Sequence, residues 1–463
     1  MDISWLYRQF KASSGVSTDS RTIAPGQIFF ALRGENFDGA DYAAVVLQKG
    51  AMLSVVTEGS KFAGSGDERI VAVPDTLQAL RSLASMHRHS LRTPEGLPLP
   101  VLGLTGTNGK TTTKELIRTA LEAGLKVCAT KGNLNNDIGV PLSVLAIPEG
   151  TQVAVIEMGA SHPDDLLPLL EVSDPDCGLI TNVGKAHLLG FGSFEGVQKA
   201  KGRLYDHIAA KGGPVFVNGD DELLVSMARE RGLETLPYGL RTQGYKVLPV
   251  SRREPFLRLD LGGKTLQTHL VGSYNAPNVL AALAVAEYFG VSRDAAIAAL
   301  EAYIPSNNRS QMVVTARNTL IVDAYNANPS SMGVALDNFA AFGGRKVALL
   351  GSMGELGEDS PAEHQALVRR LAGMELDEVR LVGGEFRRAL EAEGYSLDGN
   401  CPGSAEKICP RRPDGLLREC SAGANPVDLP QAPAPGGNAS QGHCPGSGQD
   451  SGKCSAGANP VDL

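Results

Sequence analysis

The residues best suited to chemistry form a glycine-rich stretch at positions 106–112. An apolar run, 101–104, precedes it and a helix-like segment follows it, which predicts a strand, a turn and a helix. Backbone N–H groups in such a turn can surround phosphate oxygens, and Lys110 and Thr111 suit terminal phosphates and Mg²⁺. The spacing is the short G-x-x-G-K-T, because Leu104 rather than glycine stands five residues before Gly109. We expect phosphate binding, with a plain structural turn as the alternative.

Two more polar residues follow apolar runs. Glu157 ends the run that starts at Val153, and a carboxylate at a strand end beside a phosphate loop is well placed to hold Mg²⁺. The alternative is a surface acid. His187 follows the run 177–180 and could bind a metal as neutral imidazole, although a lone histidine is more often a polar loop residue.

Polar loops follow other candidate strands. Residues 130–142 include Asn133 and Asn136, which suit turns but could also bind a polar ligand. Residues 323–329 hold Asp323, Asn326 and Asn328 before a helix start, and helix capping alone does not require all three.

A basic helix start lies at residues 198–203 and includes Lys201. Such a cluster of cations is usually a solvated helix face. The residues alone do not indicate which cation, if any, points inward.

The elements that must position these residues alternate between strands and helices. Strands are expected at 101–105, 126–130, 152–157, 177–182 and 214–217, with helices at 112–123, 163–170 and 194–211. This rhythm predicts an α/β fold with a parallel sheet, whose ligands gather at the carboxyl ends of the strands.

Four parts of the chain differ in character. A compact mixed segment precedes the alternating one, a further α/β unit follows it, and the end of the chain loses all periodicity. There, Cys420–Leu429 recurs verbatim as 454–463, which is too little repetition for a solenoid and suggests disorder. The predicted boundaries are 1–98, 99–306, 307–400 and 401–463.

Composition excludes several classes of protein. The net charge of −8 argues against a nucleic-acid binder, which needs a basic face. No apolar run reaches the ~20 residues of a membrane span, and no signal-peptide core is present. We therefore expect a cytoplasmic enzyme-like protein without membrane insertion.

Taken together and in this order, the segments resemble the Mur ligase family of bacterial cell-wall synthesis. The likeness covers residues 1 to about 390: 19–21, 25–26, 30–34 and 38–39 look like its UDP-sugar-binding domain, and 106–112 look like its ATP loop. Its D-alanyl-D-alanine-adding members are matched by 130–142, 157–159, 323–329, 354–357 and His364.

The resemblance implies a fold of three domains and a reaction. The fold would be a small α/β UDP-binding domain, a central P-loop ATPase domain and a Rossmann-like ligase domain. ATP would phosphorylate the terminal carboxylate of UDP-N-acetylmuramoyl-tripeptide, and the amine of D-alanyl-D-alanine would attack the acyl phosphate to give the amide, ADP and phosphate, in peptidoglycan precursor synthesis. The protein is expected to act as a monomer.

The resemblance also assigns residues. Those expected to act in catalysis are Lys110, Glu157, His187, Lys201 and Arg309. Those expected to bind Mg²⁺ are Thr111, Glu157, His187 and Lys201, the last as a carbamate. Those expected to bind ATP are Gly106, Thr107, Asn108, Gly109, Lys110, Thr111, Thr112, Asn275, Asn278, Arg309 and Asp323. Those expected to bind the other substrates are Ser20, Arg21, Asn133, Asn136, Asn326 and Asn328.

The end of the chain departs from the family pattern. Relatives finish the third domain with another strand, a Lys-Gly-Ser loop and a helix, and we expect residues after 400 to supply none of these. An exposed sheet edge would then reduce stability. Two alternatives follow: a catalytically impaired nucleotide-binding protein, or another amino-acid ligase of the same family.

Overall fold

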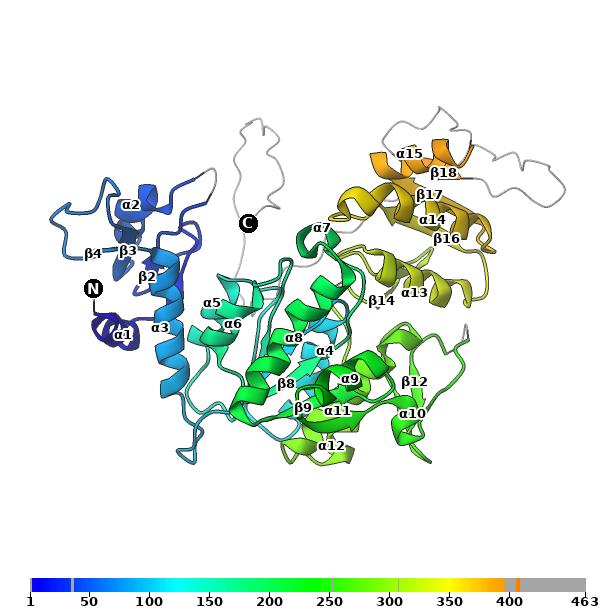
Figure 1. Cartoon of the computed structure of the whole chain (residues 1–463), viewed down its shortest axis with the longest axis horizontal. Coiled ribbons are helices and arrows are strands. Elements are labelled where there is room, and N and C mark those ends of the chain that lie inside the picture. The colour runs from blue at the N-terminus through cyan, green and yellow to red at the C-terminus, as the bar shows by residue number, and fades with distance from the viewer. Residues whose placement is uncertain (1, 35–36, 252–253, 307, 396–404, 409–463) are drawn as a thin grey trace, which may run out of the picture. The chain divides into compact units, whose positions relative to one another are not determined.

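The computed structural model (Figure 1) describes residues 2–34, 37–251, 254–306, 308–395 and 405–408. The first part of the chain forms a parallel sheet in the order β1-β2-β3-β4. Asp2 and Asp75 each cap a helix by accepting a backbone N–H with the carboxylate. The elements are α1 (Ile3–Ala12), β1 (Val16–Ser17), β2 (Ile28–Phe30), η1 (Gly39–Tyr42), α2 (Ala43–Gln48), β3 (Leu53–Thr57), β4 (Ile70–Val73) and α3 (Thr76–Ser90).

A six-stranded parallel sheet in the order β10-β9-β8-β5-β7-β6 forms the centre of the fold and confirms the predicted parallel sheet. Its strands are β5 (Val101–Thr105), β6 (Val127–Ala129), β7 (Val153–Glu157), β8 (Cys177–Ile180), β9 (Pro214–Asn218) and β10 (Glu234–Tyr238). The accompanying helices are α4 (Lys110–Glu122), α5 (Gly139–Leu145), α6 (Leu166–Ser173), α7 (Leu188–Phe191), α8 (Phe194–Lys211) and α9 (Glu222–Arg229).

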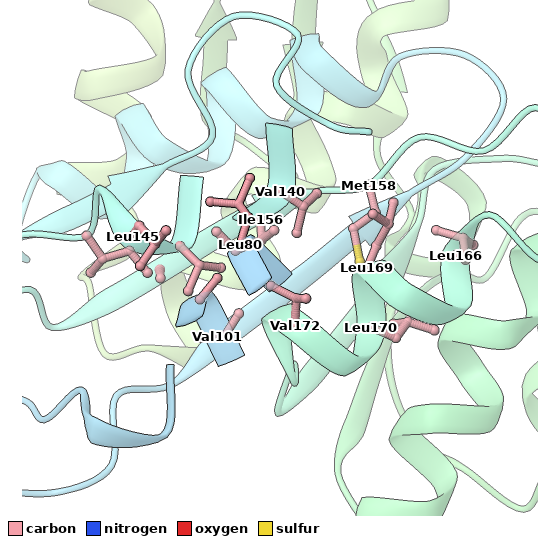
Figure 2. Close-up of a cluster of buried hydrophobic side chains, with 14 of the residues drawn as sticks. Leu80, Val101, Val140, Leu145, Ile156, Met158, Leu166, Leu169, Leu170 and Val172 are labelled. Carbon is pink, nitrogen blue, oxygen red and sulfur yellow. The ribbon is translucent and has the colours of Figure 1, made fainter. Parts of the chain in front are cut away.

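Apolar clusters fix the central sheet and its neighbours. Strand β5 is wholly buried, as expected for a central parallel strand. Leu80 of α3 packs in the same cluster as Val101 of β5, Val140 of α5 and Ile156 of β7, and Figure 2 shows these side chains converging. Helix α3 therefore belongs to the core of the central sheet as well as to the N-terminal segment.

An antiparallel sheet in the order β11-β12-β13 was not predicted. It is short, its strands β11 and β13 contact α10 and α12, and its Leu259 and Leu266 share an apolar cluster with α11, which is buried on most sides and packs on α4. The elements of this region are α10 (Leu240–Gln243), β11 (Lys246–Val247), β12 (Arg258–Asp260), β13 (Thr265–Gln267), η2 (Ser273–Asn275), α11 (Ala276–Tyr288) and α12 (Arg293–Ala302).

The last described part contains a hairpin and a three-stranded sheet in the order β16-β17-β18. The elements are β14 (Gln311–Val314), β15 (Thr319–Val322), α13 (Pro329–Ala340), β16 (Val347–Gly351), η3 (Gly357–Asp359), α14 (Ser360–Ala372), β17 (Glu378–Val382), α15 (Gly384–Ala392) and β18 (Ala405–Ile408).

Strand β18 corrects one expectation. Residues 405–408 were placed in a patternless tail, yet they pair antiparallel with β17, Val379 opposite Ile408 and Val382 opposite Ala405. A four-residue strand is too short for periodicity to reveal, and the partner strand supplies its hydrogen bonds. The rest of the tail lies outside the described residues, and the four domain boundaries stay predictions.

No helix in the described ranges is both long and apolar enough to span a membrane.

Candidate active site

The glycine-rich turn joins β5 to α4, and its geometry requires glycine at two positions. Gly106 has φ 147°, and a Cβ there would lie 1.9 Å from Thr181 Oγ1. Gly109 has φ 78° at the start of α4, in the left-handed region that glycine favours. The turn thus places backbone N–H groups at a helix N-terminus, as an anion site needs. This is the predicted strand–turn–helix arrangement.

Lys110 lies across this turn. Its Nζ donates to the carbonyl oxygens of Gly106 at 2.8 Å and Thr107 at 3.0 Å. Burial lowers the pKa of Lys110, Glu157 opposes this shift, and the positive charge of Arg309 adds to it. An incoming polyanion would relieve this crowding of cations.

Glu157, at the end of β7, is completely buried. Its Oε1 accepts hydrogen bonds from Thr111 Oγ1 at 3.1 Å and Asn135 Nδ2 at 2.8 Å. Its Oε2 has no hydrogen-bond partner among the described residues, and the nearest cation, Lys114 Nζ, is 3.9 Å away. A buried carboxylate oxygen without a donor, beside a threonine hydroxyl, has the oxygen chemistry that Mg²⁺ requires.

The rest of a Mg²⁺ shell would come from elsewhere. Across the described ranges, no group of three His, Cys, Asp or Glu side chains is placed to hold a metal ion. Mg²⁺ commonly binds one or two protein oxygens and completes its shell with phosphates and water. The pair formed by Thr111 and Glu157 fits that pattern.

His187 lines the same cleft and caps α7 with φ 51°. Its Nδ1 lies 2.5 Å from Glu355 Oε2. Burial lowers the pKa of His187, Glu355 opposes this, and nearby cations including Lys110 and Lys201 add to the lowering. A neutral imidazole with one nitrogen on a carboxylate presents its other nitrogen as a ligand.

Lys201 is 2% exposed on α8 and does not line the cleft. Its Nζ lies 5.6 Å from the centre of the Phe191 ring and makes no hydrogen bond or ion pair with any described residue. Burial, assisted by Lys110 and opposed by Asp165, lowers the pKa of Lys201 to about 7. The residues alone left open which cation of this helix points inward, and the structure shows that Lys201 does, because α8 packs its apolar side on the sheet.

Asn275 and Asn278, both expected to bind ATP, form a hydrogen bond with each other. Asn278 Nδ2 donates to Asn275 Oδ1 at 3.0 Å, and Asn275 Nδ2 donates to Ser310 Oγ at 3.0 Å. Thr113 Oγ1 donates to Asn278 Oδ1 at 3.0 Å. Both asparagines still line the cleft, so they tie α4, α11 and the 308–310 segment together at its wall.

Residues from the last part of the chain reach the same cleft. Arg309 stacks on Tyr325, with 3.7 Å from its Cζ to the ring centre, and Asp323 accepts from Tyr274 Oη at 3.3 Å. Asn328 Nδ2 donates to Asn108 Oδ1 at 2.8 Å, which links the loop before α13 to the glycine-rich turn.

The cleft that these residues line has a volume of about 1040 Å³. Among the predicted site residues, it gathers Thr107, Asn108, Gly109, Lys110, Thr111, Thr112, Asn136, Glu157, His187, Asn275, Asn278, Arg309, Asp323, Asn326 and Asn328. Gly106 lies in the same turn without lining the cleft.

Three predicted substrate residues do not line this cleft: Ser20, Arg21 and Asn133. Arg21 forms a two-pronged ion pair with Asp19, at 2.9 and 3.0 Å. Asn136 does line it, but its Oδ1 accepts the backbone N–H of Gly139 at 2.8 Å and so also shapes the start of α5.

Sequence reasoning missed several residues of the site. Asn135 holds Glu157, Asn182 Oδ1 accepts from the N–H of Asn108 at 3.0 Å, and Arg81 of α3 lines the cleft. Asn135 and Asn182 lie in polar loops that follow predicted strands. Nothing in the sequence separates them from the other polar residues of those loops, and only their contacts in the structure do. No local signal marks Arg81, because it lies inside an amphipathic helix.

Family models match most of the chain. The Mur ligase family catalytic domain matches residues 13–88, the Mur ligase middle domain 104–286, and the Mur ligase glutamate ligase domain 308–410.

Individual members of this family are similar to this chain over most of its length. The Bacillus subtilis UDP-N-acetylmuramoyl-tripeptide–D-alanyl-D-alanine ligase is 33% identical over 376 residues, 80% of each chain. Thermotoga maritima MurF ligase in complex with ADP is 27% identical with a TM-score of 0.72, covering 82% of this chain and 86% of that one. The Acinetobacter baumannii UDP-N-acetylmuramoylalanyl-D-glutamyl-2,6-diaminopimelate–D-alanyl-D-alanyl ligase is 29% identical with a TM-score of 0.69, covering 84% and 88%.

Proposed function

The chain belongs to the Mur ligase family, and from that premise we propose that it is the ATP-dependent ligase joining D-alanyl-D-alanine to UDP-N-acetylmuramoyl-tripeptide. The observation that carries the proposal is the buried Glu157 carboxylate, whose Oε2 has no hydrogen bond from a described residue and which lies beside Thr111 in a cleft that Asn328 also lines. Phosphate chemistry and an acceptor-binding loop thus share one cleft.

The phosphate turn binds and orients ATP in this proposal. The N–H groups of residues 106–112 and the Lys110 ammonium hold the phosphate oxygens, and Arg309 adds positive charge at the cleft wall. Thr111 and Glu157 hold Mg²⁺, with His187 as a further ligand. When bound, Mg²⁺ supplies neutralisation of the charge that develops during phosphoryl transfer.

The reaction then needs the tripeptide carboxylate beside ATP and the dipeptide amine beside that carboxylate. The terminal carboxylate of the tripeptide takes the γ-phosphoryl group and ADP leaves. The dipeptide amine attacks the acyl carbon and loses a proton, and phosphate departs as the amide forms. Asn326 and Asn328 line the cleft, which supports a role for them in binding the dipeptide, and we propose Ser20 and Arg21 for the UDP end. Correct placement supplies most of the rate enhancement in such a reaction.

We also propose that Lys201 becomes a carbamate by adding carbon dioxide. Its amine is buried, has no hydrogen bond to a described residue and has a pKa of about 7, so a reactive neutral fraction exists near neutral pH. Electron density beyond Nζ, or rescue of Lys201→Ala by short carboxylic acids, would support this. The absence of both the extra density and the rescue would count against carbamylation.

The setting proposed for this reaction is cytoplasmic peptidoglycan precursor synthesis, which supports cell division and shape, with the protein acting as a monomer.

The test is ADP release by the 463-residue chain with Mg²⁺, ATP and UDP-N-acetylmuramoyl-tripeptide, with and without D-alanyl-D-alanine. Dipeptide-dependent release supports the proposal. ATP binding without release would indicate the catalytically impaired alternative, and release that requires a free amino acid instead would indicate another member of the family.

A further inference from the structure

Charge in the cleft is unevenly distributed. Its described lining contains five carboxylates, Asp137, Glu157, Asp164, Asp165 and Asp323. The same lining contains three Lys and Arg side chains, Arg81, Lys110 and Arg309. Lys110 and Arg309 lie at the nucleotide end, close enough for Arg309 to lower the pKa of Lys110. An anionic substrate in the remaining part of the cleft therefore has Arg81 as its counter-charge.

The backbone of Arg81 is held firmly. It follows Leu80, which is fully buried on α3 among side chains of β5, β7 and α6, as Figure 2 shows. Leu83 and Ala84 continue this buried face. The guanidinium thus projects from a rigid element toward the cleft, a favourable arrangement for selective binding.

The guanidinium of Arg81 has unused hydrogen-bonding capacity. Nη2 contacts Asp137 Oδ2 at 3.4 Å, which is long for a charged pair, and Nε has no partner among the described residues. Arg88, two turns later on α3, instead donates to three oxygens at 2.7–2.9 Å. Arginine carries five N–H donors whose geometry suits a planar carboxylate, so the guanidinium of Arg81 can donate to a carboxylate of a ligand.

Arg81 also lies where two hollows join. It lines the main cleft and a second groove of about 380 Å³ along α3 and α6, which Gln78, Ser85 and Glu171 also line. A long substrate in the main cleft passes this junction as it extends toward the N-terminal segment.

We propose that Arg81 binds a free carboxylate in the peptide part of the UDP-linked substrate. This inference rests on the proposed function. The terminal carboxylate reacts at the nucleotide end, which leaves two sources. One is the carboxylate of a glutamyl residue, and the other is the distal carboxylate of a third residue such as the 2,6-diaminopimelate in the name of the Acinetobacter baumannii relative. A lysine at that position would lack the second source.

The experiment measures binding of both peptide nucleotides, with lysine or diaminopimelate as the third residue, to the full chain by calorimetry. Arg81→Gln should raise Kd roughly ten- to hundredfold, as expected for loss of a charged hydrogen bond. Arg81→Lys should lose less, because the charge remains. The matched control is Arg92→Gln, a nearby exposed arginine that bonds only backbone carbonyls and lies outside the cleft.

The two nucleotides separate the sources. A loss confined to the diaminopimelate nucleotide assigns Arg81 to the distal carboxylate, and an equal loss with both assigns it to the glutamyl carboxylate. Unchanged binding of both, or an equal weakening of an ATP analogue, overturns the inference. If the unaltered chain binds neither nucleotide, the proposed function fails with it, whereas binding that is insensitive to Arg81→Gln refutes the role of Arg81 alone.

Discussion

Glu157 is the residue on which the proposed chemistry depends most directly. Burial of a carboxylate is costly unless cations and hydrogen-bond donors surround it, and here Oε2 has only the distant Lys114 Nζ, at 3.9 Å, and no hydrogen bond from a described residue. Thr111 and Asn135 both hold the other oxygen, which fixes the free one in direction. Complete burial rules out the surface-acid alternative and supports the proposal that Glu157 binds Mg²⁺.

Glu157→Gln should retain the fold and lower kcat by roughly 10²–10³-fold, because the amide keeps the shape but loses the charge. The measurement is ADP release across a Mg²⁺ titration, with circular dichroism to confirm folding. Activity equal to that of the unaltered chain at low Mg²⁺ would contradict the assignment of Glu157 as a metal ligand.

His87 offers a residue-scale test of stability. It is 5% exposed, its ring packs edge-on against Phe10 at 5.0 Å, and Nε2 has no partner among the described residues. Burial, with a smaller effect of Lys11, lowers the pKa of His87 to about 4. Between that pH and about 6.5 the unfolded chain binds more protons, so stability rises with pH.

The free energy of unfolding should thus lose about 3 kcal/mol as pH falls from 6.5 toward 4, in addition to other groups' effects. Urea titrations at several pH values measure this. His87→Gln should show a flatter profile over that window, whatever its absolute stability. Parallel profiles for the two chains would show that His87 does not titrate as described.

At the scale of elements, α3 is held to the central sheet by both packing and charge. Arg88 is 4% exposed and donates to the carbonyl oxygens of Ser173 and Asp174 and to Asp176 Oδ2. Asp176 also accepts the N–H of Val101 at the start of β5. Arg88 therefore ties α3 to the end of the central sheet at which strand β5 begins.

Arg88→Met should lower the free energy of unfolding by about 1–3 kcal/mol, because it removes the side-chain donor of the buried Ser173 carbonyl, whereas Asp174 and Asp176 keep Lys211 as a donor. Denaturant titration measures this loss. Arg92→Gln, on the exposed segment after α3, should change stability by less than about 0.5 kcal/mol. Similar effects of the two substitutions would show that the Arg88 contacts add little.

At the scale of the molecule, the cleft joins distant parts of the sequence. Glu157 comes from the central sheet, Arg81 from the helix after the first sheet, and Asn328 from the loop before α13. A ligand that contacts all three would couple its binding to the stability of each of these parts.

A non-hydrolysable ATP analogue with Mg²⁺, at a hundred times its Kd, should stabilise the folded chain by about 2.7 kcal/mol. Thermal shift measurements with and without Mg²⁺ report it. Lys110→Ala should abolish most of the shift while retaining the fold. A shift that survives in Lys110→Ala would place the nucleotide elsewhere.

The sequence alone determined the parallel sheet, the glycine-rich turn and the position of Glu157 at a strand end, because alternating elements and glycine-rich turns have recognisable local patterns. It also indicated the polar loop 323–329 as a candidate part of the site. Strand β18 and the sheet β11-β12-β13 escaped it, since strands this short depend on their partners rather than on periodicity.

Only the tertiary structure decided how these residues are used. It turned Lys201 inward, brought Arg81 into the cleft and left one oxygen of Glu157 free. Burial, charge pairing and unpartnered atoms depend on elements that meet across long sequence separations, and no local pattern encodes which side chain a neighbouring element will cover.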